Sequence, residues 1–293
     1  MLPRVTGWFT GANAGRSFLA PAIIILLVLT IFPFLFTVAL TFSEVTVLGE
    51  FDMSFTGLDN WSQLFQNERF WNALRVTAQM VVIAVFFEYV FGLGLALLLD
   101  QQLPGTTFFR VLFLIPMMIS KLAVGYMWRM MFGADFGPIT GILQALGFSG
   151  QEWLTQTDTA IYIVILADIW EWTPFMLLIL FAGLQGIPKD YKEAARIDGA
   201  NAWQTFRHVI FPMLAPASIA ALLIRTIEAS KIVDKAYIMT GGGPGVSTET
   251  LTLFGYVVGL RNFNLAEGAS IALSLFLMVL IISAVFIIMM RRY

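Results

Sequence analysis

Residues 193–212 read EAARIDGANAWQTFRHVIFP; they follow one apolar run, at about 159–183, and lead into another, at about 209–230. Each run has the roughly 20 apolar residues that a helix needs to cross a bilayer. The stretch itself is rich in charged and small residues, which favour water over lipid. The pattern predicts two membrane spans joined by a structured segment outside the membrane.

The composition of the whole chain agrees with this interpretation. Of 293 residues, 58% are hydrophobic and 12% are charged, and the mean hydropathy is +0.81. A soluble domain needs much more polar surface, so the composition indicates an integral membrane protein. The formal net charge of −2 and the lack of any basic tract argue against a nucleic-acid partner, and the absence of cysteine excludes disulfides and thiol chemistry.

Six apolar windows are long enough to span a bilayer. Backbone polar groups find no water in lipid, and these runs are too long for barrel strands, so each window is predicted to be a helix. The fold class is therefore all-α, with residues 1–293 forming one transmembrane domain. The windows lie at about 18–42, 76–99, 109–132, 159–183, 209–230 and 266–290.

The distribution of Lys and Arg predicts the orientation of the spans. Positive residues collect in cytoplasmic loops, and with both termini in the cytoplasm that side carries the larger share. The N-terminal tail, 1–16, and the loop at 185–212 then face the cytoplasm. The residues on that side are Arg4, Arg16, Arg110, Lys189, Lys192, Arg196, Arg207, Arg291 and Arg292, against mainly Arg69, Arg75, Lys235 and Arg261 on the other.

Local signals predict two short helices in the segment between spans four and five. Residues 189–197 follow a proline that suits a first helical turn, and Gly199 allows a turn after them. Asn201 can cap the second helix, with Gln204 three residues on as its capping-box partner. That helix runs into span five, where Pro212 permits a bend. From these residues alone, the segment fits a docking element or a simple connector equally well.

The same segment resembles the "EAA" loop of binding-protein-dependent ABC importer permeases. The resemblance implies a coupling helix that seats in a cleft of a cytoplasmic ATPase, whose closure rocks the spans. The matching residues, and so the expected ATPase-coupling residues, are Glu193, Ala194, Ala195, Asp198, Gly199, Ala200, Phe206 and Pro212, with Ile210 fitting the pattern too.

Segments on the opposite side resemble the carbohydrate-type members of this family. They include the loop 240–250, which contains GGGPG, and the stretches 55–61 and 70–74. The resemblance covers about 15–290 and is to the first maltose permease in a short, six-span form. The extra N-terminal spans and large outer domain of longer members are absent from this sequence.

The resemblance also implies partners and a location. Family importers combine a second homologous permease, a dimer of cytoplasmic ATPases and an extracytoplasmic solute-binding protein, in a bacterial inner membrane. ATP and Mg are used by the ATPase, because this chain lacks the Gly-x-x-x-x-Gly-Lys string of a phosphate-binding loop. The chain is thus expected to be a transport subunit without cofactor or metal; its single histidine, His208, rules out a site of several imidazoles.

Charged residues inside the spans mark the expected substrate pathway. Each costs about 2.5–3.5 kcal/mol at mid-membrane on insertion scales, so such residues face a cavity or one another. By resemblance, the middle parts of spans four and five line the transport site, where carboxylates can accept hydroxyl hydrogen bonds and an indole can stack on a sugar ring. The candidates are Asp168, Glu171, Trp172, Arg225 and Glu228, with Lys121 as a weaker member.

The alternative role for these charges is structural. Ion pairs between spans, such as Glu171 with Arg225, or packing against the second permease explain the same residues, and Glu88 fits the structural role best. Trp170 lies on another face of its helix from Trp172 and is expected to face lipid or the interface.

A sugar, polyol or sugar derivative is the expected substrate. Lys121 and Arg225 keep an anionic derivative open as an alternative, although three acidic neighbours oppose it. An ion-driven secondary transporter would also use charged residues in its spans, but it needs no ATPase-docking segment. An intramembrane enzyme has no support beyond the buried carboxylates.

Overall fold

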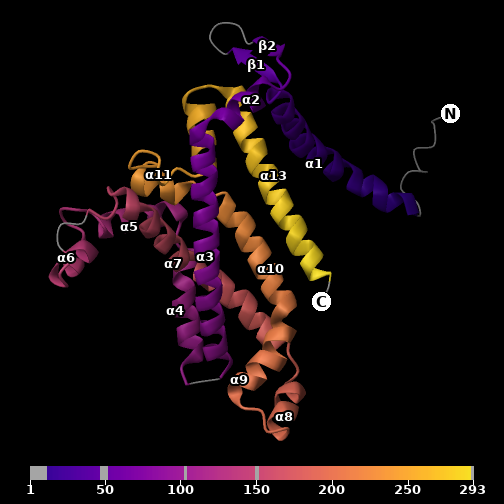
Figure 1. Cartoon of the computed structure of the whole chain (residues 1–293). Coiled ribbons are helices and arrows are strands. Elements are labelled where there is room, and N and C mark those ends of the chain that lie inside the picture. Colours follow the sequence, from indigo (N-terminus) through magenta and orange to yellow (C-terminus); the bar gives the residue numbers. More distant parts are fainter. Residues whose placement is uncertain (1–11, 47–51, 102–103, 149–151, 292–293) are drawn as a thin grey trace.

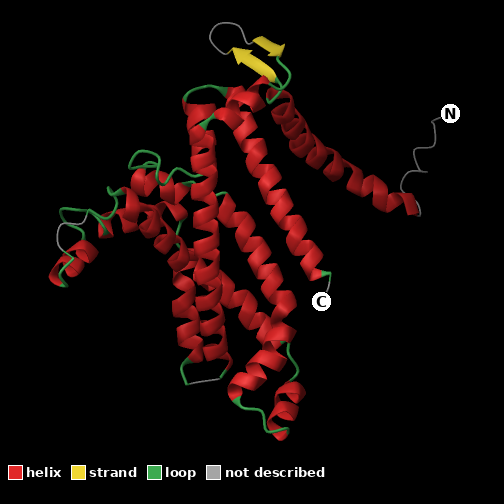
Figure 2. Ribbon diagram, in the orientation of Figure 1, coloured by secondary structure: helices red, strands yellow, loops and turns green. Residues whose placement is uncertain are grey.

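The computed structural model describes residues 12–46, 52–101, 104–148 and 152–291. Most of the tail at 1–16, including Arg4, and the C-terminal Arg292 lie outside the described residues. Figure 2 shows that the described chain is helical apart from one two-stranded hairpin.

Long helices run between two ends of the molecule (Figure 1). One end carries the hairpin, and the other carries two short helices, α8 (Lys189–Ile197) and α9 (Ala202–Thr205). The long helices are α1 (Ala12–Leu40), α3 (Glu68–Asp100), α7 (Thr157–Gln185), α10 (Phe211–Ser230) and α13 (Leu265–Met290).

Five of the six predicted windows coincide with helices long and apolar enough to cross a membrane. The described residues contain such helices at Phe18–Leu40, Glu68–Asp100, Thr157–Gln185, Ala202–Ser230 and Leu265–Met290.

The window at 109–132 is not one straight helix, and that prediction is wrong. It forms α4 (Thr106–Met118) and α5 (Lys121–Met131), which meet at 93°. Pro116 removes a backbone donor from the last turn of α4, and Ile119 is extended. Ser120 is also extended, and its side chain accepts a hydrogen bond from the backbone N–H of Ala123, which starts a new helix. Together the two helices can account for a sixth, broken span.

Short elements cover the hairpin end. Strands β1 (Ser43–Thr46) and β2 (Asp52–Phe55) pair antiparallel. The Asn60 amide donates to the carbonyls of Thr41 and Ser43 and holds the hairpin to the helix that follows it. The remaining elements are α2 (Asp59–Gln66), α6 (Pro138–Ala145), α11 (Asp234–Thr240), α12 (Leu251–Tyr256) and the π-helical turn η3 (Val257–Arg261).

Helices α3 and α7 form the centre of the fold and touch through their backbones. A Cβ atom on Gly92 would lie 2.5 Å from the Cβ of Met176 and 2.9 Å from the amide nitrogen of Leu177. Only glycine therefore permits this approach. Apolar clusters on both sides of the contact join α3 and α7 to α5 and to α10.

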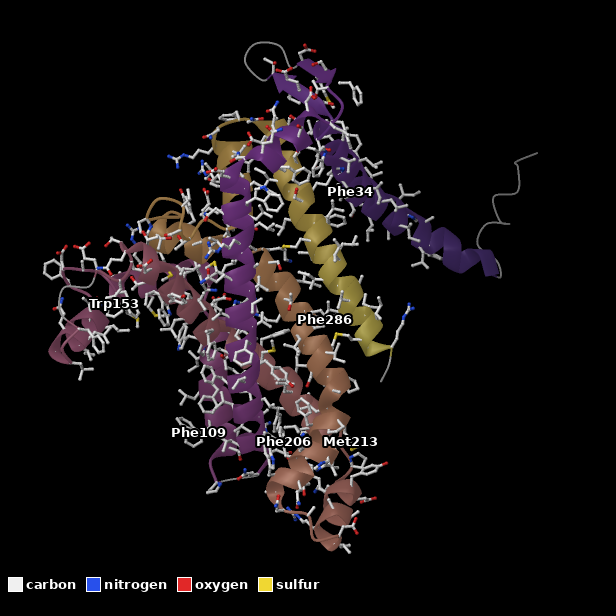
Figure 3. All side chains as sticks on the ribbon, viewed as in Figure 1. Phe34, Phe109, Trp153, Phe206, Met213 and Phe286 are labelled. Atoms are coloured by element: carbon white, nitrogen blue, oxygen red, sulfur yellow. The ribbon has the colours of Figure 1, made fainter. Side chains whose placement is uncertain are left out.

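Helix α1 leans away from the other long helices and keeps most of its apolar surface exposed (Figure 1). Its described contact with α13 includes Phe34, whose ring lies 5.5 Å from that of Phe276 (Figure 3). Helix α13 runs from the hairpin end toward the end that carries α8 and α9. The first described residues of α1 and the last described residues of α13 both lie away from the hairpin (Figure 1).

Candidate functional site

Arg225 of α10 is the centre of a buried group of charges. Its Nε lies 2.6 Å from Oε2 of Glu88 on α3, and its Nη2 donates to Oε1 of the same residue at 2.8 Å. The same Nη2 also donates to Oδ2 of Asp168 on α7. A single guanidinium thus joins three long helices.

Lys235 of α11 adds a second cation to this group. Its ammonium donates to Oδ1 of Asp168 at 2.7 Å and pairs with Oε2 of Glu171. Burial alone would lower the pKa of Lys235, but the two carboxylates outweigh burial and raise the pKa above its usual value. Lys235 therefore stays charged and attaches α11 to α7.

We call these five residues, Glu88, Asp168, Glu171, Arg225 and Lys235, the charge network. Their side chains are between 0 and 5% exposed. Such burial is tolerable only because every charge has an opposite partner, since a buried charge left alone destabilises a protein by several kcal/mol. With three carboxylates and two cations, the network carries one excess negative charge when all five are ionised.

Trp172 lies at the edge of the charge network. The guanidinium carbon of Arg225 is 5.0 Å from the centre of its indole ring, and the ammonium of Lys121 is 5.4 Å from that centre. Both distances suit cation–π attraction. Trp172 separates the buried Arg225 from the exposed Lys121 at the start of α5.

A small cavity opens beside Trp172. Its volume is about 40 Å³, whereas sites for drug-sized ligands measure roughly 300–1,000 Å³. The space admits water but no sugar. The charged and aromatic lining consists of Lys121, Asp168, Trp172, Arg225, Glu228, Lys231, Asp234 and Lys235.

The structure brings five of the six predicted pathway residues to this cavity and leaves Glu171 behind it. Glu171 pairs with Lys235, so the predicted pair of Glu171 with Arg225 is wrong. The reason is that α11 packs on α7 and places its lysine between the two carboxylates. Glu228 sits at the mouth, 39% exposed, and pairs with Lys231 at 2.7 Å.

Trp170 also differs from expectation. It is half-buried, and its ring centre lies 6.2 Å from that of Trp128 on α5. The bend between α4 and α5 brings α5 against this side of α7. A straight helix over 109–132 would not be expected to make that contact.

The segment between α7 and α10 has the predicted local structure. Helix α8 (Lys189–Ile197) ends at a turn in which Gly199 has φ +79°. Helix α9 (Ala202–Thr205) begins with a capping box: Asn201 accepts from the Gln204 backbone at 2.9 Å, and the Asn201 backbone donates to the Gln204 side chain at 2.8 Å. The two helices project together from one end of the molecule (Figure 1).

A π-helical turn, η2 (Phe206–Ile210), connects α9 to α10. Pro212 lacks the N–H that would complete a regular helical turn, and the amide of Phe211 donates to the carbonyl of Phe206, five residues back. In place of the predicted bend at Pro212, the helix therefore has a π-helical turn that ends two residues before this proline.

The exposed side chains of this segment differ partly from those expected. Ala195 is buried. Phe206 (Figure 3) is half-buried, and its ring lies between those of Trp203 and Phe211. Trp203 and Ile197 are exposed instead, at 65% and 86%. The exposed apolar surface of this segment therefore comes from Trp203 and Ile197 more than from Phe206.

Comparison with known proteins identifies the family. Residues 88–292 match the family described as "Binding-protein-dependent transport system inner membrane component". The chain belongs to this permease family. It is a transport component of the ABC importer type, and its many apolar helices make it an integral membrane protein.

Relatives match the permease over nearly its whole length. The trehalose/maltose transport system permease protein MalF of Thermococcus litoralis is 35% identical over 93% of this chain and 91% of its own. The sulfoquinovosyl glycerol transport system permease protein SmoG of Agrobacterium fabrum is 32% identical over 99% of this chain and 95% of its own. A crystal structure of a bacterial alginate ABC transporter, bound to a periplasmic protein carrying an alginate pentasaccharide, contains a chain with TM-score 0.84, 20% identity and coverage of 99% and 98%.

The permease holds its GGGPG loop firmly in place. The hydroxyls of Thr240 and Thr248 lie 2.6 Å apart across the loop, and Arg69 makes two hydrogen bonds of 2.7 Å to Glu249 just after it. The loop lies at the hairpin end, opposite α8 and α9. Among the described residues, no group of histidine, cysteine and acidic side chains could hold a metal ion.

Sequence reasoning overlooked Lys235 and set Glu88 aside. Lys235 follows span five in a segment expected to lie outside, and it was counted only for orientation. Charge balance within the predicted spans did not single out Lys235, because the windows already contain four cations, Arg110, Lys121, Arg129 and Arg225.

Proposed function

We propose that the permease forms half of the translocation pathway of an ATP-driven importer for a neutral sugar, polyol or closely related derivative. The supporting observation is Trp172, an aromatic face at the cavity with Asp168 and Glu228 beside it. An indole can stack on the apolar face of a sugar ring, while carboxylates accept its hydroxyl hydrogen bonds. The trehalose/maltose permease among the relatives supports the same substrate class.

The charge network would close this pathway at rest. Opening a sugar-sized space beside Trp172 requires α7, α10 and α11 to separate, and the pairs of Asp168 with Arg225 and Lys235 cross their boundaries. Substrate hydroxyls can replace part of these contacts once the helices move. The pathway then has two states, and a partner that binds one of them more tightly shifts the population.

The partners follow from the family. We expect a second permease across the pathway and an extracytoplasmic binding protein at the hairpin end. We also expect a dimer of cytoplasmic ATPases that docks at α8 and α9 and itself binds Mg and ATP. The permease would then lie in a bacterial inner membrane as one domain, residues 1–293, with both termini in the cytoplasm. Segment 185–212, with Glu193, Asp198 and Ala200 exposed or half-exposed, would receive the ATPase.

The decisive experiment purifies the permease from its native membrane in mild detergent. Copurified proteins are identified by mass, and ATP hydrolysis is measured with a panel of trehalose, maltose and polyols. Recovery of an ATPase stimulated by one of these solutes supports the proposal. Recovery of the permease alone, with transport driven by an ion gradient, would contradict it and favour a secondary transporter.

An anionic sugar derivative is the second candidate. Lys121 and Lys231 line the mouth of the cavity, and a relative is named for sulfoquinovosyl glycerol, which carries a sulfonate. Glu228 and Asp234 line the same mouth and balance the two lysines, which favours a neutral substrate. Stimulation by a sulfonated glycoside and not by its uncharged analogue would reverse this preference.

A further inference from the structure

A single carboxylate joins three elements at the α8 end of the molecule. Asp100 is the last residue of α3. Its Oδ1 accepts a hydrogen bond of 2.8 Å from the side-chain amide of Gln185, the last residue of α7. Its Oδ2 accepts one of 2.7 Å from the ammonium of Lys192 on α8. Both oxygens of Asp100 are therefore engaged, one by the end of α7 and the other by α8.

Among the described residues, helix α8 has little else that attaches it to the long helices. Ala195 is its single buried residue, so apolar packing contributes little to its position. The ion pair with Asp100 is partly sheltered, with side chains 23% and 20% exposed, which reduces screening by salt. The contact sets where α8 sits relative to α3.

Helix α3 links Asp100 to the charge network without interruption. Glu88 lies 12 residues before Asp100 in the same helix, about 18 Å along its axis. Between them, Gly92 packs directly on the backbone of α7, so that α3 is supported along this length. A displacement of its end at Asp100 reaches Glu88, which pairs with Arg225.

We propose that Asp100 is a positioning residue that attaches the coupling helix α8 to α3 and transmits its displacement to the charge network. The inference rests on the proposed function, because it takes α8 as the element that the ATPase moves. Asp100 itself touches neither ATPase nor substrate in this role. It makes α8 and α3 move as one.

The test compares single neutralised variants with a reversed pair. Asp100→Asn and Lys192→Gln each remove one charge of the pair, and the double variant D100K/K192D restores it with opposite sign. Arg291→Gln is the control, because Arg291 is an exposed cation at the end of α13 and lies outside segment 185–212 and the cavity. The intact importer is reconstituted in vesicles with trehalose or maltose, whichever stimulates ATP hydrolysis. The measured quantity is the number of sugar molecules transported per ATP hydrolysed.

We expect both single variants to lower transport per ATP by about 5-fold or more, the lower end of typical coupling between sites. The reversed pair should recover most of the loss, and Arg291→Gln should behave as the unmodified chain does. Unchanged transport per ATP in Asp100→Asn, or a reversed pair no better than the single variants, overturns the proposal.

A second readout separates this inference from the proposed function. Amide hydrogen exchange across 189–197 should be faster in Asp100→Asn, while exchange in α13 should not change. If the unmodified chain recruits no ATPase, the proposed function fails, but this comparison still decides whether Asp100 holds α8. Equal exchange across 189–197 in both proteins overturns the attachment even if an ATPase binds.

Discussion

Arg225 is the residue on which the buried charges depend most. It is 1% exposed and pairs with Glu88 and Asp168, two carboxylates from different helices. Opposite charges brought together at such depth contribute modest net stability, but removing one partner leaves the others uncompensated. Loss of Arg225 therefore destabilises the protein mainly by leaving Glu88 and Asp168 with too little opposite charge.

Arg225→Gln should destabilise the folded protein by about 3–5 kcal/mol, the usual effect of breaking a buried pair. Thermal unfolding in detergent measures the change. Lys231→Gln is the control: its pair with Glu228 is exposed, so the change should stay below about 1 kcal/mol. Equal unfolding temperatures for the two variants would contradict a network held together by Arg225.

Trp172→Ala should weaken transport without preventing assembly. Trp172 is half-buried, and its ring faces the cavity that we assign to the pathway. Losing an aromatic stacking surface costs about 1–1.5 kcal/mol, or roughly a tenfold higher KM for substrate-stimulated transport. Trp172→Phe keeps a ring and should recover most of the affinity. A normal KM in the alanine variant would remove Trp172 from the substrate site.

At the scale of elements, the bend between α4 and α5 has the widest consequences. Two extended residues, Ile119 and Ser120, turn the chain by 93°. Helix α5 then packs on α11, where Gly125 lies against Ile238. This packing holds α11, and with it Lys235, beside α7. Apolar length alone could not reveal the bend, because the window at 109–132 is long enough for a single span.

Gly199→Trp should prevent recruitment of the ATPase. A Cβ atom at Gly199 meets nothing within 4 Å, so an added side chain would project from the turn between α8 and α9 toward a docked partner. The φ of +79° adds strain for most residues, whereas asparagine tolerates this region well. Gly199→Asn is thus the control for strain. Copurification of the ATPase should be lost in the tryptophan variant and kept in the asparagine variant; retention in both would contradict docking at this turn.

At the scale of the whole molecule, the conformation described here is closed beside Trp172. The cavity of about 40 Å³ leaves no room for a sugar, yet it is ringed by charges from α5, α7, α10 and α11. A transport pathway needs those helices to separate and return. Ala229 lies in the cavity wall and is 3% exposed, so its accessibility to water should increase when these helices separate.

The chain contains no cysteine, so one introduced thiol reports on one position. Ala229→Cys should react slowly with a water-soluble maleimide at rest, and at least about tenfold faster when the intact importer turns over ATP with substrate. Ser62→Cys, on an exposed helix near the hairpin, should react equally in both conditions. An unchanged rate at Ala229 would place the moving pathway elsewhere.

The amino-acid sequence by itself determined the features that depend on neighbours along the chain. Apolar length predicted six spans, of which five are single helices long enough to cross a membrane among the described residues. Turn and capping residues predicted α8, the turn at Gly199 and the Asn201 capping box. The EAA-like residues indicated the permease family before any comparison. Each of these signals is local, because backbone hydrogen bonding and lipid solvation act within a single helix or turn.

Only the tertiary structure decided which charges meet. Glu88, Asp168, Arg225 and Lys235 come from four different helices, and Asp100 meets Lys192 across 92 positions of the chain. These pairings depend on how α5 bends, how closely Gly92 lets α3 approach α7, and where α11 folds back. Coulomb attraction between side chains depends on their separation in space, and a sequence gives only their separation along the chain.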